Sequence, residues 1–379
     1  MRASRADLLI VLTSLVAEGC PQLALQLAQH WQQQGLKVEL LCLRAEPTDL
    51  LPEFQALGIP IHRFHLGHGL ARYPRLAWLS YQLCRRRRPQ AVLSFPLGWH
   101  AFIALGARAA GVRRLCAHVG NLPPVWTGTA FRKFKLLVQL GRPFTHRLLC
   151  CSEYIRQATI RDFQVRPRET LTVYNACDLD RFQDLPRPVS PHTPPRVGMV
   201  ARLEVHKDQP SLIRAAALLR DRGYPIEVRL IGEGSHRPQL EALIAELNLG
   251  NHVQLLGSRR DIPALLSQLD LFVFSARPDE GFGIALAEAM AAGMPIVATD
   301  VGACREVLDG GRCGLLVEPS NPAALAAGIQ AVLADPKSAQ TRAIAARQRA
   351  SCHFSVATMA TIYSQELGMS LSCPTLQRL

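Results

Sequence analysis

Two glutamates, Glu280 and Glu288, stand on either side of a short glycine-rich turn in the stretch SARPDEGFGIALAEAMAAGMP. Glu280 comes just after an apolar run typical of a buried strand, and Glu288 falls in the first turns of the helical pattern that follows. An ionised carboxylate only accepts hydrogen bonds, and its two oxygens match two adjacent hydroxyl groups. The pair is therefore typical of a site for a ligand with two sets of neighbouring hydroxyls, such as a nucleotide-sugar.

The turn between the two glutamates suits the phosphates of such a ligand. Gly281 and Gly283 allow the backbone around Phe282 to turn sharply and to approach a ligand closely. The helix predicted from Ile284 directs unpaired N–H groups to the same place, which favours an anion. Two alternatives remain open. Glutamate is common at helix starts for dipole reasons alone, and a glycosidase pair would need both carboxylates to converge across a sugar, which this spacing does not indicate.

Two cations could neutralise the same phosphates. Arg202 and Lys207 follow the first predicted strand of the second half of the chain. The planar donor fork of arginine and the compact charge of lysine suit a diphosphate, although a pair of exposed surface charges is the alternative. Gly232 and Gly234 follow the next strand, but Arg237 stands where a dinucleotide fingerprint needs its third glycine. We therefore expect Gly232 to form a tight turn close to a nucleotide, and not an NAD site.

These residues are embedded in an alternation of apolar strands and helical patterns. The first half has strand candidates at 8–14, 37–43, 61–66, 91–95, 115–119, 147–151 and 171–174. The second half has them at 197–201, 227–231, 253–256, 271–274, 296–299 and 314–317. Buried strands that alternate with helices predict doubly wound parallel α/β sheets, whose ligands bind beyond the carboxyl ends of the strands.

The length of 379 residues predicts two domains, and a hydrophobic content of 48% is enough for two cores. Five prolines in residues 184–198 are typical of a linker. We therefore divide the chain into an N-terminal Rossmann-like domain at 1–186, a second domain at 187–350 and a final helical segment at 351–379. With two such domains, the natural ligand site is the cleft between them.

The net charge of +13 is carried entirely by the first half of the chain. Residues 1–190 hold 25 Lys and Arg against 12 Asp and Glu, whereas residues 191–379 hold 18 of each kind. Such a field attracts nucleic acid, an anionic membrane or a phosphorylated substrate, or it simply forms a solvated surface. No aromatic platform or known motif supports nucleic-acid binding.

The eleven cysteines are scattered and include no C-x-x-C pair, which favours a reducing cytosol over a disulfide scaffold. The first twenty residues imitate a signal peptide. However, Asp7 directly precedes the apolar run and residues 17–19 make a poor cleavage site, so we predict a first buried strand there. No apolar segment is long enough to span a membrane.

The second half carries a family resemblance. The segments VARLEVHKDQPSLIRA, LIGEGSHRPQLEAL, VQLLGSRRDIPALLSQLDLFVFSA and DEGFGIALAEAMAAGMPIVATDVGACREVL together resemble glycosyltransferase family 4. The resemblance implies a GT-B fold, in which two Rossmann-like domains face each other across a cleft, and retaining transfer from a nucleotide-sugar. The E-x7-E spacing from Glu280 to Glu288 is the signature of that family. The resemblance is specific over 196–320 and extends more weakly through VYNACDLDRF to HFSVATMATIYSQEL, a helix that in the family packs back on the first domain.

The resemblance also implies roles for single residues on the donor side. Arg202 and Lys207 would hold the diphosphate, Glu288 would bind the ribose hydroxyls, and Glu280 would contact the donor sugar. The turn residues Gly281, Phe282, Gly283 and Ile284 would bring backbone N–H groups near the sugar and the phosphate. The segment 257–262, with Arg260, would lie beside the base. The family needs no metal cofactor, and no acidic metal cage is visible in this sequence.

On the acceptor side the resemblance is looser. The first domain binds the acceptor in this family, and His118 at the end of a predicted strand resembles a histidine that lines the family's cleft. A structural histidine is the alternative. Members often have paired glycines in the first strand–helix loop, but here Gly19 is followed by Cys20, so a phosphate contact from Gly19 is an open expectation.

The predicted function is a retaining hexosyltransferase that acts in cell-surface glycan assembly, with a UDP-sugar as the expected donor and a GDP-sugar as the alternative. The acceptor would be a glycan or a lipid-linked molecule. The stretches RRRR at 85–88 and AFRKFKLLVQLGRPF at 130–144 suggest contact with an anionic membrane, or else a packed helix with a basic face. We expect a cytoplasmic protein, at the inner face of the plasma membrane if that contact holds. A nucleotide-sugar epimerase of the same fold and a non-catalytic nucleotide-sugar-binding subunit are the alternatives.

Overall fold

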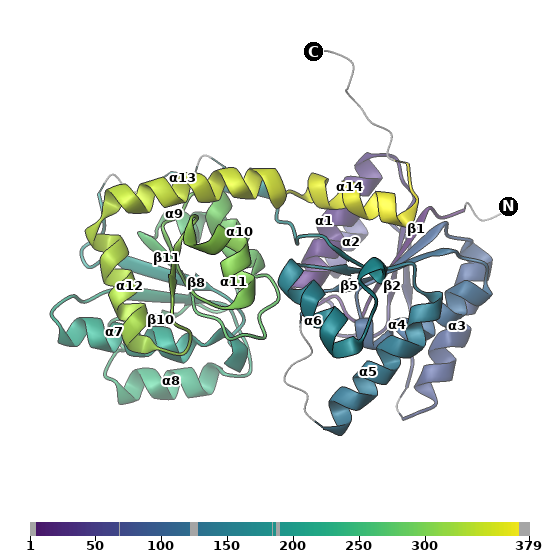
Figure 1. The fold of residues 1–379 in the computed structure, drawn as a ribbon, viewed down its shortest axis with the longest axis horizontal. Helices are drawn as coiled ribbons and strands as arrows, with labels where there is room; N and C mark the ends of the chain where they lie inside the picture. The colour runs from purple at the N-terminus through teal and green to yellow at the C-terminus, as the bar shows by residue number, and fades with distance from the viewer. Residues whose placement is uncertain (1–4, 68, 122–127, 184, 187–189, 371–379) are drawn as a thin grey trace, which may run out of the picture. The chain divides into compact units, whose positions relative to one another are not determined.

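The computed structural model describes every residue except 1–4, 68, 122–127, 184, 187–189 and 371–379. Contacts divide the chain into two units, each of which is described by itself. The first unit comprises Met1–Asn175 with Val356–Leu379, and the second comprises Ala176–Ser355. Each is a parallel sheet covered by helices (Figure 1). No described helix has a stretch that is both long enough and apolar enough to pass through a bilayer.

The first unit is built on a seven-stranded parallel sheet in the order β3-β2-β1-β4-β5-β6-β7. The strands are β1 (Leu8–Leu12), β2 (Val38–Cys42), β3 (Ile61–Arg63), β4 (Ala91–Ser94), β5 (Arg114–Val119), β6 (Arg147–Cys150) and β7 (Thr170–Thr172). The apolar run that imitates a signal peptide forms β1, which is buried throughout and pairs with β2 and β4. The predicted first strand is therefore confirmed.

The helices of the first unit fill the connections between these strands. They are α1 (Gly19–Gln33), α2 (Leu51–Ala56), α3 (Arg72–Arg87), α4 (Leu97–Ala109), α5 (Thr129–Gly141), α6 (Glu153–Phe163) and α14 (Val356–Leu367). Two single-turn 3-10 segments, η1 (Arg142–Phe144) and η2 (Pro167–Glu169), follow α5 and α6, and a third, η3 (Leu179–Phe182), follows β7 and belongs to the second unit. Helices α3 and α4 bury their apolar faces against one side of the sheet, together with Leu9 and Val11 of β1.

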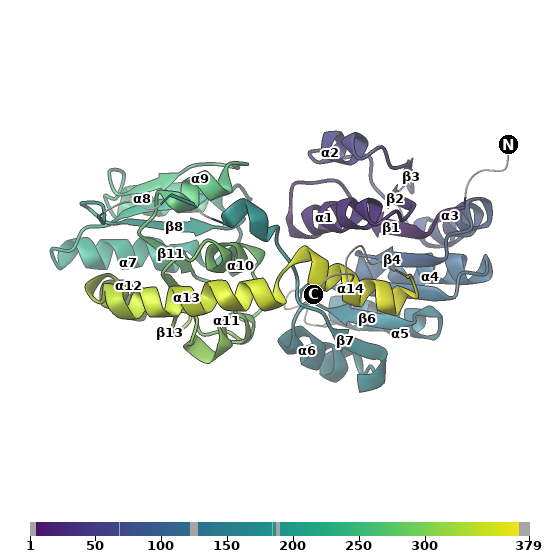
Figure 2. The same ribbon diagram turned by 90° about the horizontal axis from the view of Figure 1, so that it is seen from above.

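Helix α14 comes from the end of the chain but packs in the first unit, against α1, β4 and β5 (Figure 2). Its contacts are polar as well as apolar. Trp31 Nε1 donates to Ser364 Oγ at 2.9 Å, and both side chains are buried. Arg147 donates to the carboxylate of Glu366 at 3.0 Å. The last helix is thus an integral part of the core of the first unit.

The second unit has a six-stranded parallel sheet in the order β10-β9-β8-β11-β12-β13. Its strands are β8 (Arg196–Val200), β9 (Glu227–Ile231), β10 (Val253–Leu255), β11 (Leu271–Phe274), β12 (Ile296–Thr299) and β13 (Leu315–Val317). Its helices are α7 (Gln209–Asp221), α8 (Arg237–Glu246), α9 (Ile262–Ser267), α10 (Ile284–Ala291), α11 (Gly302–Val307), α12 (Pro322–Ala334) and α13 (Pro336–His353), with short turns η4 (Val205–Lys207) and η5 (Asp309–Gly311). All the predicted strands are present to within three residues at their ends.

Two features differ from the sequence reading. The chain passes from the first unit to the second after Asn175, before the proline-rich segment. The residues that follow already belong to the second unit, because Phe182 is buried there and Cys177 N–H donates to Phe354 O at 3.0 Å. Part of that segment, residues 184 and 187–189, lies outside the described residues. The 18-residue helix α13 was not predicted, because its buried face consists only of alanines and gives a weak apolar pattern.

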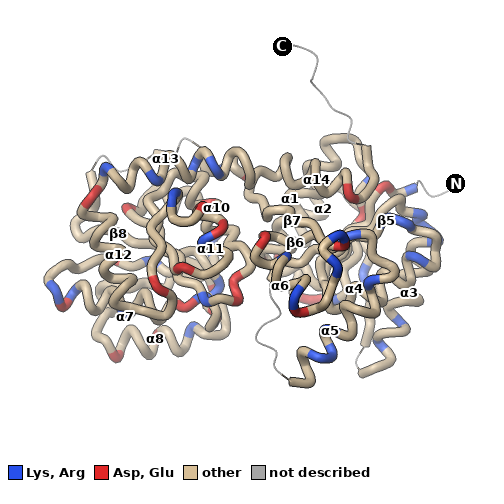
Figure 3. Tube along the Cα trace, viewed as in Figure 1, with Lys and Arg blue, Asp and Glu red and all other residues tan. Residues whose placement is uncertain are grey.

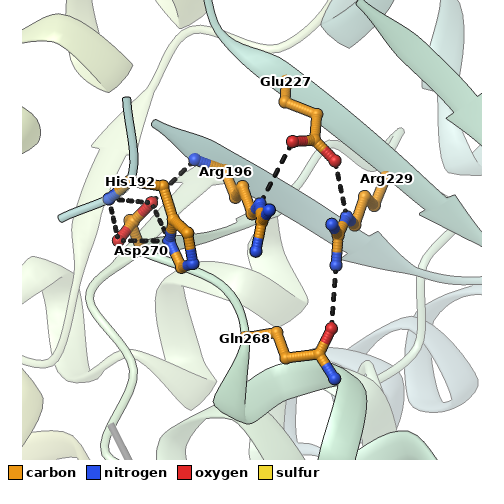
Figure 4. Close-up of polar contacts among 6 residues, drawn as sticks. All are labelled: His192, Arg196, Glu227, Arg229, Gln268 and Asp270. Carbon is orange, nitrogen blue, oxygen red and sulfur yellow. Dashed lines mark hydrogen bonds and ion pairs between the residues drawn. The ribbon is translucent and has the colours of Figure 1, made fainter. Parts of the chain in front are cut away.

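A polar cluster ties the amino ends of three strands of the second unit together (Figure 4). The carboxylate of Asp270, just before β11, accepts from the Arg196 N–H at 2.7 Å and from His192 Nδ1 at 3.0 Å. The carboxylate of Glu227 on β9 accepts from the guanidinium of Arg196 at 3.1 Å and from that of Arg229 at 2.8 Å. Ligands of parallel sheets bind at the opposite, carboxyl edge, so we assign this cluster a structural role.

We expect Asp270→Ala to lower the free energy of unfolding of the second unit by about 2–3 kcal/mol, because hydrogen bonds to a mostly buried charged acceptor are among the strong ones. Urea unfolding measures the change. Asp221→Ala is the matched control, since Asp221 is 61% exposed in its pair with Arg220, and it should cost about 0.5 kcal/mol or less. Equal unfolding midpoints for Asp270→Ala and the unmodified protein would contradict the role given to the cluster.

Candidate active site

At the carboxyl edge of the second sheet, the loops after three adjacent strands are joined by backbone hydrogen bonds. Gly232 N–H donates to Gly257 O at 2.9 Å, and Leu203 N–H donates to Glu233 O at 2.9 Å. A Cβ atom on Gly232 would lie 2.0 Å from Ala201 O. The close backbone approach expected at Gly232 is therefore present, but it is made to a neighbouring loop of the protein. A nucleotide contact by Gly232 stays a prediction.

The loop after β8 carries both predicted phosphate-binding cations. Arg202 is exposed, and its carbonyl accepts from the side chain of Gln209 at 2.7 Å. Lys207 ends η4 and is followed by Asp208, whose φ of +49° is left-handed. Ser275 Oγ, from the loop after β11, donates to Asp208 O at 3.0 Å. This bond holds the loop that follows β8 against the loop that follows its neighbour β11.

At this edge the partly buried Lys207 forms an ion pair with the buried Glu280. The ammonium of Lys207 contacts one carboxylate oxygen of Glu280, and the other oxygen accepts from the N–H groups of Gly281 at 3.1 Å and Phe282 at 3.3 Å. Burial pushes the pKa of Glu280 upward. The charge and hydrogen bond of Lys207 and the Phe282 N–H outweigh burial, so the pKa of Glu280 lies below its ordinary value. Glu280 is thus a fixed carboxylate and Lys207 a fixed ammonium.

The turn before α10 has the geometry expected of its glycines. Gly283 is the N-cap of α10 with a φ of +83°, and a Cβ there would come within 3.0 Å of the Phe274 ring. The Phe282 ring is buried and meets Phe354 edge-on at 5.2 Å, so only the backbone of Phe282 faces the turn. Ile284, the first residue of α10, is partly buried. Because the N–H of Phe282 donates to Glu280, ligand contact by this turn stays a prediction.

Glu288 lies in the second turn of α10 and differs from Glu280 in its surroundings. Its side chain is partly exposed and makes no hydrogen bond or ion pair with any other residue that the structure describes. Burial raises the pKa of Glu288 to about 7, although the charge of nearby Arg181 acts in the opposite direction. A carboxyl group that lacks a protein partner is suited to accept hydrogen bonds from a ligand.

Four charged residues of the second unit are predicted to bind the donor, and the structure brings only three of them close together. The three are Arg202, Lys207 and Glu280, and the fourth is Glu288. The pKa of His206 is lowered by burial and by the charges of Lys207 and Arg202, against the charge of Glu280, so these three side chains act on one histidine. Glu288 lies farther along α10, beside η3. There Arg181 donates to Arg260 O at 3.2 Å, which places the predicted base-side segment next to the helix that carries Glu288.

The two predicted residues of the first unit have different environments. His118 on β5 is 1% exposed, its Nδ1 lies 2.8 Å from the hydroxyl of Tyr363, and burial lowers its pKa to about 4. This geometry supports a neutral, structural histidine, and the catalytic role stays a prediction. Gly19 begins α1 and is partly exposed.

Sequence reasoning missed two residues. Arg181 has no spacing relation to Glu288, and Tyr363 is 245 residues from His118. Both stand in stretches that carry the family resemblance, VYNACDLDRF and HFSVATMATIYSQEL, but nothing in those stretches indicated that they lie near Glu288 and His118. Within the described residues, no group of three or more His, Cys, Asp or Glu side chains is arranged to hold a metal ion.

Comparisons with known proteins agree with this architecture. Residues 180–349 match the family model "Glycosyl transferases group 1", and residues 18–181 match "Glycosyltransferase Family 4". The chain is 30% identical, over 70% of its own length and 73% of the relative's, to the N-acetylgalactosamine-N,N'-diacetylbacillosaminyl-diphospho-undecaprenol 4-α-N-acetylgalactosaminyltransferase of Campylobacter jejuni. The chain belongs to the GT-B glycosyltransferases.

Other known proteins resemble the chain over different parts of its length. The glycogen synthase of Mycobacterium tuberculosis is 31% identical over 58% of this chain, which spans only 53% of that protein. A crystal structure of Anabaena HepE in complex with UDP-glucose matches with a TM-score of 0.81 and 23% identity, over 96% of this chain and 99% of that one. This match over nearly the whole chain, together with the two parallel α/β sheets, confirms the predicted GT-B fold.

Proposed function

We propose that this glycosyltransferase is a retaining hexosyltransferase. It transfers a hexose from a nucleoside-diphosphate sugar to a hydroxyl of a lipid-linked or polysaccharide acceptor in cell-surface glycan assembly. The anomeric bond of the donor breaks as the nucleoside diphosphate leaves, and the acceptor hydroxyl forms the new bond on the same face. The observation that carries the proposal is the arrangement at the start of α10, where Lys207 pairs with Glu280 while Glu288 has no protein partner among the described residues.

Each of these groups has a chemical part in the transfer. The ammonium of Lys207 and the guanidinium of Arg202 offset the charge that develops on the departing diphosphate. Glu280, fixed by Lys207 and two backbone N–H groups, accepts hydrogen bonds from hydroxyls of the donor sugar. Glu288 accepts the two ribose hydroxyls, and the segment with Arg260 lies by the base. Lys207 has three N–H donors and, within the part of the chain that the structure describes, one carboxylate partner, so donors remain for a phosphate.

One comparison favours a UDP-sugar over a GDP-sugar as the donor. Two others favour a glycan or a lipid-linked molecule as the acceptor. The Anabaena neighbour was crystallised with UDP-glucose. The Campylobacter relative is named for a diphospho-undecaprenol substrate, and the mycobacterial relative is named for glycogen. The excess positive charge in residues 1–190 fits work at the anionic cytoplasmic face of a membrane.

A thermal-shift panel of nucleotides and nucleotide-sugars tests the proposal. A ligand that binds only the folded protein stabilises it and therefore raises the melting temperature. At a ligand concentration of 100 Kd the stabilisation is about 2.7 kcal/mol. We expect UDP and UDP-hexoses to raise it more than GDP, GDP-mannose or NAD. A panel without any nucleotide response would contradict a nucleotide-sugar enzyme, and a larger response to GDP would overturn the choice of donor.

A further inference from the structure

Three consecutive helices of the first unit carry basic residues and no acidic ones. Helices α3, α4 and α5 contain five, one and three Lys or Arg residues respectively, and their sequences include no Asp or Glu. Figure 3 shows the blue segments along these helices. The helices pack side by side, since a Cβ on Gly106 of α4 would touch the backbone of α3 and one on Gly141 of α5 would touch Ala101 of α4. They form one layer of adjacent helices whose charged residues are all basic.

The first two turns of these helices build a cluster of cations and aromatic rings. Arg72 Nη2 donates to the Tyr73 hydroxyl at 3.3 Å, and its guanidinium lies 5.1 Å from the Tyr73 ring centroid and 5.0 Å from that of Trp99. Lys133 of α5 reaches the same ring, with its ammonium 5.7 Å from the Tyr73 centroid. Phe102 completes the wall at 4.9 Å from Tyr73. We call these five residues the Tyr73 cluster.

Neither cation of the Tyr73 cluster is neutralised by the protein. Arg72 and Lys133 make no ion pair with any acidic residue that the structure describes, and Arg72 Nε is a buried N–H without a hydrogen-bond partner there. An uncompensated guanidinium and ammonium that converge on one ring match the charge and the acceptor oxygens of a phosphate. Because α3, α4 and α5 follow parallel strands, the cluster lies at the carboxyl edge of the sheet, where ligands of this fold class bind.

An exposed apolar stripe begins beside the cluster. Leu136 and Leu140 of α5 are 67% and 50% exposed, and they lie three and seven residues after Lys133, on the same face of the helix. Leu105 of α4, four residues after Ala101, is 41% exposed. Lysine at one end of a leucine stripe, with tryptophan and tyrosine beside it, is the arrangement of groups at a membrane interface.

We propose that the Tyr73 cluster binds the phosphate head group of an anionic membrane lipid, whose acyl chains lie against Leu136 and Leu140. The proposal deepens the proposed function, because it assigns the membrane contact to one surface. Charge complementarity favours this ligand. All charged residues of the three helices are basic, and the apolar stripe on α5 lies beside Arg132 and Lys135 of the same helix. A lipid with a phosphate head and an apolar tail satisfies both halves.

Vesicle flotation tests this surface. The full-length protein is mixed with vesicles of phosphatidylcholine alone or of phosphatidylcholine with phosphatidylglycerol. We expect binding to the anionic vesicles, and the double variant Arg72→Gln with Lys133→Gln should bind them roughly 30-fold more weakly, since each interfacial cation contributes about 1 kcal/mol. The matched control Arg85→Gln with Arg86→Gln removes the same charge from the exposed far end of α3 and should lose clearly less binding.

Equal losses in the two double variants would overturn the proposal, because binding would then follow net charge and not this cluster. Equally strong binding by the Arg72→Gln, Lys133→Gln protein would overturn it as well. We also expect Leu136→Ser with Leu140→Ser to remove the part of vesicle binding that persists in high salt. Inorganic phosphate that saturates the cluster and abolishes flotation at low concentration would instead identify a free-phosphate site.

The thermal shift caused by UDP distinguishes a failure of this membrane surface from a failure of the proposed function. The Tyr73 cluster lies in the first unit, and the predicted nucleotide-binding residues lie in the second. All variants should therefore keep the thermal shift caused by UDP, which also shows that they are folded. A normal nucleotide response without vesicle binding would contradict the surface alone, whereas vesicle binding without a nucleotide response would contradict the enzyme function alone.

Discussion

Lys207→Ala should lower turnover about 100- to 1,000-fold with a smaller change in KM. The ammonium of Lys207 is partly buried at the carboxyl edge of the second sheet, where it contacts Glu280 and lies 5.4 Å from the Phe274 ring. A charge held in advance at a leaving group stabilises the transition state more than the bound substrate, so its loss affects kcat first. Steady-state kinetics with a UDP-sugar and the natural or a model acceptor measure the effect.

The loss of Lys207 also leaves the Glu280 carboxylate buried without its cation, which destabilises the site by itself. The double variant Lys207→Ala with Glu280→Gln separates the two effects. It should recover folding stability relative to Lys207→Ala but not turnover. Lys337→Ala, at an exposed position on α13, is the control for the loss of a lysine and should leave kcat unchanged. Turnover within twofold of the unmodified enzyme in Lys207→Ala would exclude an electrostatic role for this residue.

Glu288→Gln should weaken nucleoside-diphosphate binding roughly 10- to 100-fold above pH 7 while it stabilises the ligand-free protein. Burial raises the pKa of Glu288 to about 7 from an ordinary value of 4.5, so folding disfavours its charged form. The sign of the pH effect follows from this shift. The folded state binds more protons than the unfolded state between about pH 4.5 and 7, and Glu288 therefore costs stability progressively as the pH rises through that window.

Melting temperatures at pH 5 and pH 8, with and without UDP, measure both effects. Without ligand, Glu288→Gln should melt higher than the unmodified protein at pH 8 and close to it at pH 5. With UDP, the unmodified protein should gain more at pH 8 than at pH 5, because the carboxylate is the form that accepts two hydroxyls. Glu246→Gln, on the exposed end of α8, should show neither effect. A Glu288→Gln protein that binds UDP normally at pH 8 would remove Glu288 from the ribose site.

The sequence predicted both sheets because their strands are continuous apolar runs separated by helical patterns. The ends of β9, β11 and β12 were predicted to the residue, since charged residues, glycines and prolines bound those runs. The sequence did not predict α13, because its buried face consists of alanines. Alanines can pack against a close neighbour, but they give only a weak hydrophobic periodicity in the sequence.

The sequence predicted the candidate site only in part. The residue types around the Gly-Phe-Gly turn indicated a hydroxyl- and phosphate-binding site, but they could not reveal that Lys207 and Glu280 bind each other. That contact joins residues 73 positions apart, and it exists because β8 and β11 are neighbours in the sheet. The burial of His118 was equally hidden, since it depends on a tyrosine from the last helix.

The membership of α14 in the first unit has a consequence for biosynthesis. The ribosome releases α14 after every residue of the second unit, yet Tyr363 and Ser364 from this helix are needed to cover His118 and Trp31. The core of the first unit therefore stays incomplete through most of translation. It can be completed only after the second unit and α14 have been synthesised. A fragment that stops at Asn175 would expose that uncovered apolar surface and aggregate, whereas grafting residues 356–370 onto it through a flexible tether should restore its solubility.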